Sequence, residues 1–321
     1  MNTAIQKPRT VSRLTRGYLI CVTATVFWST TAIFIRYLTE TYHLPPLVLA
    51  FWRDLSLAIA LGLVFALFNP LRLHLEKRHW GFMVLYGLVL SFFNSLWTVS
   101  VGLNGAAVST VLAYSSAAFT AVLGWWFLSE SLGPMKILAV TLSLLGCVFV
   151  SGAYDLAVWG VNPLGIITGL ASGMLFAVYN LMGKTSSERK INPWTVLVYA
   201  FGIAAIFLFC FTRISAWLPT GVGSTNLLWL DGALLGWLIL ITLAVGPTVG
   251  GFGLYTVSLG YLPASVANVI ATLEPVMTAI LAFLLLGEHF TPPQWAGSLL
   301  IIAGVIVLRV SEGRAKILEP A

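Results

Sequence analysis

The chain has 321 residues, of which 59% are hydrophobic and only 9% are charged. Soluble proteins are typically about 45–50% apolar and about 25% charged, so this chain has too few charges to cover a water-soluble fold. The formal net charge is +6, from 17 Lys and Arg against 11 Asp and Glu. A nucleic-acid-binding protein would gather its basic residues along one stripe, whereas here they lie in short clusters between long apolar runs. The composition therefore predicts an all-α polytopic membrane protein without a nucleic-acid partner.

Ten apolar runs approach the length of about 20 residues that a helix needs to cross a bilayer. In chain order the predicted helices cover residues 17–37, 46–68, 80–102, 105–128, 134–152, 163–183, 193–212, 233–257, 263–286 and 292–309. Proline, glycine and asparagine stand at most of the breaks, where they end or start helices. We therefore expect short connections and antiparallel neighbours, with one longer polar stretch at 214–231.

The distribution of Lys and Arg predicts the orientation of the chain. With a cytoplasmic N-terminus, 14 of the 17 basic residues fall on the cytoplasmic side, as the positive-inside rule requires. We expect a multi-pass protein of the cell (inner) membrane with both termini cytoplasmic, present as a monomer or weak homodimer. Cys21, Cys147 and Cys210 lie in apolar spans without metal-like spacing, so we expect packing roles, with no metal and no cofactor.

The chain contains an internal repeat. Residues 98–150 align without a gap onto residues 256–308, 158 positions later, and 16 of the 53 aligned pairs are identical. At a slightly smaller offset the first and sixth helices also correspond weakly, and Pro46 aligns with Pro193. The pattern predicts two five-helix repeats, 17–152 and 163–309. Because five is odd, the second repeat starts on the opposite side of the bilayer, and such inverted repeats are typical of alternating-access carriers.

Two segments carry a family resemblance. They read "LGYLPASVANVIATLEPVMTAILAFLLLGEHFTPPQWAGSLLIIAGVIVL" in the second repeat and "GLNGAAVSTVLAYSSAAFTAVLGWWFLSESLGPMKILAVTLSLLGCVFV" in the first. Both resemble the EamA-type domain of the drug/metabolite transporter superfamily. The resemblance implies a ten-helix secondary transporter, often an exporter of amino acids, other metabolites or toxic compounds, with the fifth and tenth helices at the periphery. The first repeat departs from the pattern, with Ser116 and Ala117 where the second has Glu274 and Pro275.

Glu274 is one of three charges inside predicted spans, where a charge is costly enough to indicate a functional or paired role. It follows Pro263 by eleven residues, about 16 Å along a helix at 1.5 Å per residue, which places it near the midplane. Pro275 frees the carbonyl of Ala271 from its usual helical bond. Together the carboxylate and the carbonyl predict a cation or proton site. The alternative is a structural Glu bonded to a neighbouring helix.

Arg53 and Asp54 are the other two intramembrane charges. Adjacent residues point about 100° apart on a helix, so we expect one to face a cavity and the other a neighbouring helix. Arg53 is the better substrate candidate because a guanidinium can bind a carboxylate or phosphate bidentately. The alternative is an ion pair between Arg53 and either Asp54 or Glu40.

Polar and aromatic residues near the same level form a second group of candidates for substrate binding or coupling. They are Trp28, Ser29, Thr30, Trp97, Tyr114, Ser116, Tyr179, Asn180 and Tyr255. Trp97 and Tyr255 are repeat partners and candidate aromatic gates. The alternative for each is an interfacial anchor or an interhelical bond.

Glycines suggest two further features. Gly165, Gly169 and Gly173 form a small-residue stripe that would allow close helix packing. Gly246 and Pro247, with the glycines that follow, predict that the eighth helix bends during a transport cycle; packing alone is the alternative.

These features predict a secondary active transporter that exports amino acids or related small metabolites by alternating access, with the proton as the candidate coupling ion. Arg53 and Glu274 offer both signs of charge, which suits a zwitterion. An organic-cation or drug efflux carrier anchored by Glu274 is one alternative, and a membrane receptor or scaffold without transport is another. An enzyme is not expected, because the four histidines fall in loops or at span ends and no catalytic motif is present.

Overall fold

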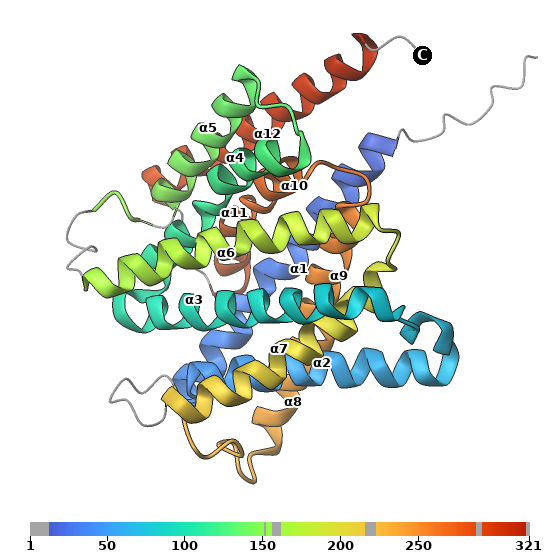
Figure 1. Cartoon of the computed structure of the whole chain (residues 1–321). Coiled ribbons are helices and arrows are strands. Elements are labelled where there is room, and N and C mark those ends of the chain that lie inside the picture. Colours follow the sequence, from blue (N-terminus) through green and yellow to red (C-terminus); the bar gives the residue numbers. More distant parts are fainter. Residues whose placement is uncertain (1–12, 151, 156–161, 216–222, 287–290, 319–321) are drawn as a thin grey trace, which may run out of the picture.

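The computed structural model describes residues 13–150, 152–155, 162–215, 223–286 and 291–318, and its regular elements there are all helical (Figure 1). They are α1 (Arg13–Tyr42), α2 (Pro46–Phe68), η1 (Pro70–Leu73), η2 (Lys77–His79), α3 (Trp80–Tyr114), α4 (Ser116–Leu128), α5 (Pro134–Val150), α6 (Pro163–Glu188), α7 (Pro193–Ser215), α8 (Leu234–Leu243), η4 (Ala244–Thr248), α9 (Val249–Ser258), α10 (Ala264–Ala271), α11 (Glu274–Leu286) and α12 (Pro292–Leu318).

Within the described residues, nine helical segments are long and apolar enough to cross a membrane. The apolar helix Pro134–Val150 is shorter, so the ten-helix layout stays a prediction. Large apolar side chains are exposed on the outside of the bundle, including Phe68 at 81% and Trp126 at 72% of their surface. A water-soluble monomer rarely exposes apolar patches of this kind. The chain is therefore an integral, polytopic membrane protein.

The bundle has two ends, which we name by the prolines in their turns. The Pro45 end holds the α1–α2 turn and the start of α6, and the Pro70 end holds η1, η2, the α6–α7 turn and the turn at Pro263. The Pro70 end lies on the right of Figure 1, where α1 also begins and α12 ends. In the predicted topology it would face the cytoplasm.

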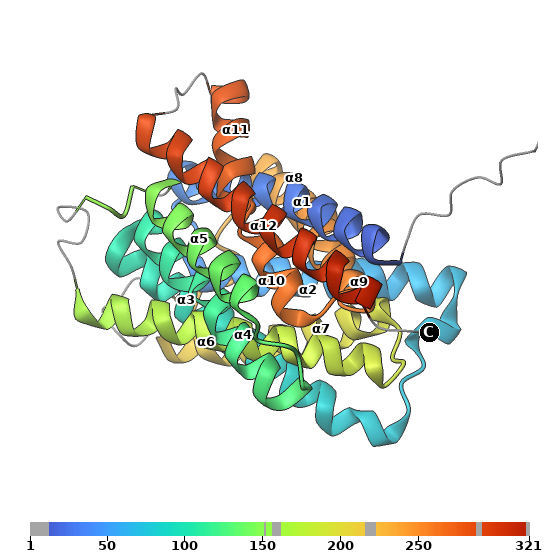
Figure 2. The ribbon, with the colours of Figure 1, turned by 90° about the horizontal axis from the view of Figure 1, so that it is seen from above.

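Five helix pairs form the main contacts of the bundle. α3 packs on both α6 and α7, α5 on α12, α2 on α7 and α1 on α9. The α5–α12 pair lies along the top of the bundle in Figure 1 and therefore in front of it in the view from above (Figure 2). Its backbones touch through glycine: a Cβ on Gly146 would lie 2.6 Å from the carbonyl oxygen of Gly297, and one on Gly304 would lie 2.8 Å from that of Ala139. Only glycine allows this approach.

The predicted glycine stripe on α6 also allows close packing. A Cβ on Gly169 would lie 2.6 Å from the side chain of Leu112, and one on Gly173 would lie 2.5 Å from Ser115 Oγ. The carbonyl of Gly165 accepts a hydrogen bond from Ser100 at 2.8 Å. The glycines therefore bring α6 close to Ser100 and to the segment 112–115.

The third and fourth helices are divided differently from the prediction, which placed a break between residues 102 and 105. The structure assigns residues 80–114 to α3 and begins α4 at Ser116. However, Ser100 Oγ lies 2.8 Å from Ser109 Oγ. Nine residues of straight helix would separate the two by about 13.5 Å, so the chain reverses between them.

The ninth predicted helix is also broken, into α10 and α11, at Thr272 and Leu273. Pro275 contributes to the break, because it has no N–H to donate to the carbonyl of Ala271. In the repeat alignment these two positions correspond to Tyr114 and Ser115, where α3 gives way to α4. Both repeats therefore interrupt a helix at the same place.

The eighth predicted helix consists of α8, the π-helical turn η4 and α9. Pro247 lies inside η4, and Thr248 Oγ1 donates to the carbonyl of Leu243 at 2.8 Å. A π-helical turn is an irregularity often found at functional sites. The irregularity supports the predicted bend in the eighth helix. Movement of this helix during a transport cycle stays a prediction.

Stiffening this turn should slow transport. A Cβ on Gly246 would meet no atom within 4 Å, so Gly246→Ala raises helix propensity by about 1 kcal/mol without a clash. We expect Gly246→Ala, alone and with Pro247→Ala, to lower the initial transport rate without lowering thermal stability. Gly250→Ala is not a clean test, because its Cβ would lie 2.8 Å from the ring of Phe27. Unchanged rates in both variants would show that the turn serves packing alone.

The end helices are longer than predicted. α1 runs from Arg13 to Tyr42 and α12 extends to Leu318, so both continue past the apolar runs into polar sequence. The described part of the 214–231 stretch folds onto the Pro45 end: Trp229 Nε1 donates to the carbonyl of Tyr42 at 3.0 Å, and Trp52 Nε1 to that of Leu227 at 2.7 Å.

Candidate functional site

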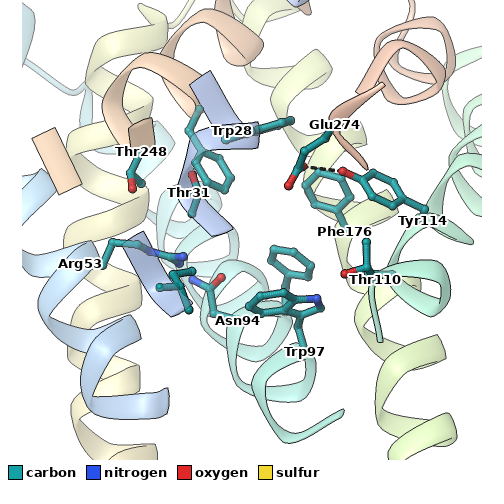
Figure 3. Close-up of a pocket in the computed structure, with 14 residues that line it drawn as sticks. Trp28, Thr31, Arg53, Asn94, Trp97, Thr110, Tyr114, Phe176, Thr248 and Glu274 are labelled. Atoms are coloured by element: carbon teal, nitrogen blue, oxygen red, sulfur yellow. Dashed lines mark hydrogen bonds between the residues drawn. The ribbon is translucent and has the colours of Figure 1, made fainter. Parts of the chain in front are cut away.

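A cavity of about 130 Å³ lies among the helices. This volume is several times the roughly 10–15 Å³ that a cavity needs to hold one water molecule, so the cavity has room for a small metabolite. Its lining, part of which is labelled in Figure 3, consists of Trp28, Thr31, Ile35, Arg53, Phe93, Asn94, Trp97, Thr110, Ala113, Tyr114, Phe176, Thr248, Phe252 and Glu274. These residues come from both predicted repeats.

Glu274 is the carboxylate of this cavity and stands at the first position of α11. Its Oε2 accepts a hydrogen bond from Tyr114 Oη at 2.5 Å, across 160 residues of sequence. Tyr114 ends α3, and Glu274 follows the equivalent break in the second repeat. The bond therefore ties the two interrupted helices together at the cavity wall. It leaves the second carboxylate oxygen, Oε1, for a ligand or a proton.

Arg53 faces Glu274 from the other side of the cavity (Figure 3). Its Nε donates to Asp54 Oδ1 at 3.1 Å, and Asn94 Nδ2 donates to Asp54 Oδ2 at 2.9 Å. Asp54 is fully buried behind Arg53. The carboxylate thus orients the guanidinium through Nε, and the terminal nitrogens are the part of Arg53 that can bind an anionic group.

Aromatic rings form the floor of the cavity toward the Pro70 end. The ring of Trp28 lies 4.9 Å from that of Phe252, 6.3 Å from that of Phe176 and 4.8 Å from that of Tyr255. Tyr255 is fully buried beneath this layer. Rings at these distances pack favourably, and together they close the bundle below the cavity.

The structure brings some of the sequence candidates to the cavity and leaves others elsewhere. The candidates that line it are Trp28, Arg53, Trp97, Tyr114 and Glu274. The candidates that do not line it are Ser29, Thr30, Asp54, Ser116, Tyr179, Asn180 and Tyr255. The hydroxyls of Ser29 and Thr30 bond to carbonyls of their own helix. The roles of all twelve stay predictions.

Ser116 and Asn180 belong instead to a buried polar cluster where α4, α6 and α10 meet. Asn268 Nδ2 donates to Thr120 Oγ1 at 2.7 Å, and Asn180 Nδ2 donates to the same oxygen at 3.5 Å. Ser116 Oγ donates to Asn268 Oδ1 at 3.4 Å. The hydrogen bonds of this cluster connect the two repeats on the side of Glu274 that faces the Pro70 end.

Sequence reasoning missed Asn94, Thr31 and Thr110. Asn94 is an amide within a predicted membrane span, and the cost of burying an amide could have identified it. Thr31 and Thr110 stand in helices with several hydroxyl residues, and nothing in the sequence separates those that face the cavity from those that bond to their own backbone.

Glu130 closes the Pro70 end. Its Oε1 accepts from the backbone N–H of Ala264 at 2.5 Å, and its Oε2 accepts from Ser265 Oγ and, at 3.2 Å, from the N–H of Ser265. Lys136 Nζ donates to Ser265 Oγ at 2.9 Å and lies 3.8 Å from Glu130 Oε2. A carboxylate on the first N–H groups of α10 is stabilising, because it pairs donors that lack helical partners. Glu288, its repeat partner, lies outside the described residues.

Removing this cap should destabilise the protein. Glu130→Ala leaves the N-terminus of α10 and Lys136 without the carboxylate, and losing a helix cap costs about 0.5–2 kcal/mol. We expect a lower thermal unfolding midpoint in detergent for Glu130→Ala and no change for Glu188→Ala, which removes an exposed carboxylate at the end of α6. Equal midpoints for both variants would contradict the capping role.

The transmembrane bundle and its central cavity, which carries one guanidinium and one carboxylate in a largely apolar lining, are typical of a membrane protein of the transporter class. A family model described as the EamA-like transporter family matches residues 15–152 and 163–310. The chain therefore belongs to the EamA-like transporter family.

The chain is similar to three curated transporters. It is 26% identical over 312 residues to the uncharacterized transporter YwfM of Bacillus subtilis, with 94% of this chain and 97% of YwfM covered. It is 28% identical over 295 residues to a probable amino-acid metabolite efflux pump of Salmonella typhimurium, covering 91% and 93% of the two chains. It is 27% identical over 254 residues to the threonine/homoserine exporter RhtA of the same organism, covering 77% and 78%.

A solved crystal structure shares the fold, with a TM-score of 0.73 at 19% identity over 93% of this chain and 98% of that chain. The family and these relatives are transporters. Among the residues that the structure describes, no group of three or more His, Cys, Asp or Glu side chains is placed to hold a metal ion.

Proposed function

We propose that the protein exports small amino acids or closely related metabolites from the cytoplasm by alternating access, with Glu274 as the proton-coupling group. The observation that carries the proposal is a cavity with a guanidinium on one wall and a carboxylate on the other (Figure 3). A zwitterion can place its carboxylate on Arg53 and its ammonium on Glu274. The names of the amino-acid-exporting relatives support the same substrate class.

The proposed architecture is ten helices in two inverted repeats, in the inner membrane, with both termini cytoplasmic. Two observations support it. The family model matches the chain in two segments, and four of the main helix pairs correspond when the repeats are exchanged: α3 with α6 corresponds to α1 with α9, while α2 with α7 and α5 with α12 each pair equivalent helices. Inverted repeats related in this way rock about a central site in alternating-access carriers.

The other candidate is an efflux carrier for organic cations. The aromatic rings of Trp28, Trp97 and Phe176 stand near Glu274 in the lining, and a cation binds favourably over such rings. This alternative would leave Arg53 without a substrate role. It therefore differs from the proposal in how transport responds to changes at Arg53.

Counterflow with purified protein in liposomes tests the proposal. Liposomes loaded with unlabelled amino acid are diluted into trace labelled amino acid, with L-threonine, L-homoserine, L-alanine and L-leucine as the panel and tetraphenylphosphonium as the organic cation. We expect accumulation of at least one amino acid, faster across an imposed pH difference. Accumulation of the organic cation alone would favour the other candidate.

A further inference from the structure

We propose that an anionic phospholipid of the surrounding membrane binds at one corner of the bundle, with its phosphate held by Arg13, Arg16 and Arg309. The corner lies at the Pro70 end, where α1 begins and α12 ends (Figure 1). The three arginines do not line the cavity described above. The proposal therefore goes beyond the transport site and does not depend on the substrate.

Side-chain contacts bring the three arginines together. The guanidinium carbons of Arg13 and Arg16 lie 5.8 Å and 5.5 Å from the centre of the same ring, that of Tyr261. Arg309 Nη2 donates to Thr15 Oγ1 at 2.6 Å, one residue before Arg16. Guanidinium groups from α1 and α12 therefore meet at a single place on the surface.

Helix packing fixes the position of this place. A Cβ on Gly17 would lie 2.7 Å from Tyr261 Cβ, so only glycine lets α1 lie against the turn between α9 and α10. The guanidinium carbon of Arg309 lies 4.8 Å from the centre of the Tyr18 ring, a distance at which a cation and an aromatic ring attract each other. The helices that carry the arginines are therefore held next to each other without a ligand.

Most hydrogen-bond donors of the three arginines are available to a ligand. Each guanidinium has five N–H groups. Arg13 uses one for the carbonyl of Gly260, at 3.1 Å, and Arg309 uses one for Thr15. Within the described residues Arg16 makes no hydrogen bond, and no carboxylate pairs with any of the three. A phosphate, with its several oxygen atoms, can therefore accept bonds from more than one of them.

The net charge of the chain is concentrated near its two ends. Residues 1–18 contain four basic residues and no acidic one, and residues 309–321 contain three basic and two acidic residues. Together these segments carry +5 of the formal net charge of +6. Anionic lipids of the cytoplasmic leaflet attract basic segments next to a transmembrane helix, and basic pockets between such helices bind anionic headgroups. Charge complementarity therefore favours an anionic lipid over a neutral one.

The depth of the site matches that of a lipid headgroup. The first predicted span begins at residue 17 and the last ends at residue 309, so Arg16 and Arg309 stand where the apolar runs meet polar sequence. Leu19, one turn deeper on α1, is 60% exposed, and Ile306 and Ile302 on α12 are 57% and 40% exposed. Residues three, four and seven positions apart share one face of a helix. An apolar surface therefore lies directly below the arginines.

This apolar surface distinguishes a lipid from a free phosphate ion. A phospholipid bound through its phosphate would lay its acyl chains over the exposed side chains of α1 and α12, which adds contacts that scale with the apolar area covered. A free phosphate ion has no group that can use this surface. We therefore expect the arginines to hold a lipid that inorganic phosphate cannot replace.

Native mass spectrometry of the detergent-purified protein, titrated with phosphatidylglycerol, tests the proposal. A Lys or Arg near an anionic membrane surface contributes about fivefold to binding. We expect the combined variant Arg13→Gln, Arg16→Gln and Arg309→Gln to raise the Kd for phosphatidylglycerol at least about tenfold. Arg16→Gln alone removes no hydrogen bond within the described residues and should raise the Kd about fivefold in a protein that folds normally.

A matched variant removes three positive charges elsewhere at the Pro70 end. Lys77→Gln, Arg78→Gln and Arg189→Gln change exposed residues in η2 and directly after α6, and together they should bind phosphatidylglycerol like the wild type. Zwitterionic phosphatidylcholine should bind the wild type at least about tenfold more weakly. Thermal unfolding midpoints without added lipid show whether each variant is folded, and Arg16→Gln decides the matter if the combined variant is not.

The proposal is overturned if Arg16→Gln and the combined arginine variant bind phosphatidylglycerol like the wild type. It is also overturned if the matched variant loses as much affinity as the combined arginine variant, because binding would then follow net charge and not this site. Equal affinity for phosphatidylcholine would contradict the charge requirement. Displacement of phosphatidylglycerol by inorganic phosphate would assign the arginines to a soluble anion and reject the lipid.

Discussion

Replacing Glu274 by glutamine is expected to reduce amino-acid counterflow at least about tenfold and to abolish its response to a pH difference, in a protein that still folds. Glutamine keeps the size of the side chain and can still accept the hydrogen bond from Tyr114, but it cannot gain or lose a proton. A hydrogen bond to a charged group is worth about 1.5–3 kcal/mol, which is about 10- to 150-fold in binding. Initial rates in liposomes, with and without a pH difference, measure both effects.

Two control variants separate this role from a structural one. If Glu274 served only to hold Tyr114, Tyr114→Phe would reproduce the loss seen in Glu274→Gln. We expect Tyr114→Phe to reduce amino-acid counterflow much less than Glu274→Gln does, because the carboxylate of Glu274 stays. Glu76→Gln changes an exposed carboxylate that pairs with Arg78 in the α2–α3 connection, and should transport like the wild type.

Replacing Arg53 is expected to raise the KM for amino acid about 10- to 100-fold, because the substrate carboxylate loses a charge-assisted partner. Arg53→Lys keeps the positive charge but cannot bind a carboxylate bidentately, so its KM should lie between those of the wild type and Arg53→Gln. An organic-cation carrier would behave differently, since removing a positive charge from the cavity would improve its substrate binding. KM values in counterflow and the response to tetraphenylphosphonium measure the difference.

The ion pair with Asp54 complicates any single change at Arg53. Removing one partner of a buried pair leaves an uncompensated charge and costs about 3–5 kcal/mol. The double variant Arg53→Leu with Asp54→Asn removes both charges and keeps an acceptor for Asn94. We expect it to match the wild type in thermal stability and still to bind substrate poorly. A wild-type KM in the double variant would make Arg53 a structural residue.

Much of the fold could be predicted, because the length of an apolar run and the position of a proline depend on the local sequence alone. Several helices begin at the proline that the sequence indicated, namely Pro46, Pro134, Pro163, Pro193 and Pro292. The breaks at Ser115 and at Thr272 were not predicted. Each interrupts an apolar run without changing its hydropathy, and Pro275 alone does not distinguish a kink from a break.

The charged part of the cavity could also be predicted, because a charge in a membrane is costly and so points to a role. Arg53 and Glu274 were found in this way. Asn94 was missed because an amide in an apolar helix carries a weaker penalty. The bond from Tyr114 to Glu274 joins residues 160 positions apart, and only the folded chain shows it.

An experimental structure with bound L-threonine or L-homoserine would test the proposed substrate site. We expect the ligand in the cavity, with its carboxylate within hydrogen-bond distance of the Arg53 guanidinium and its ammonium within the same distance of Glu274. Ligand density elsewhere in the bundle, or in this cavity without contact to either charge, would contradict it.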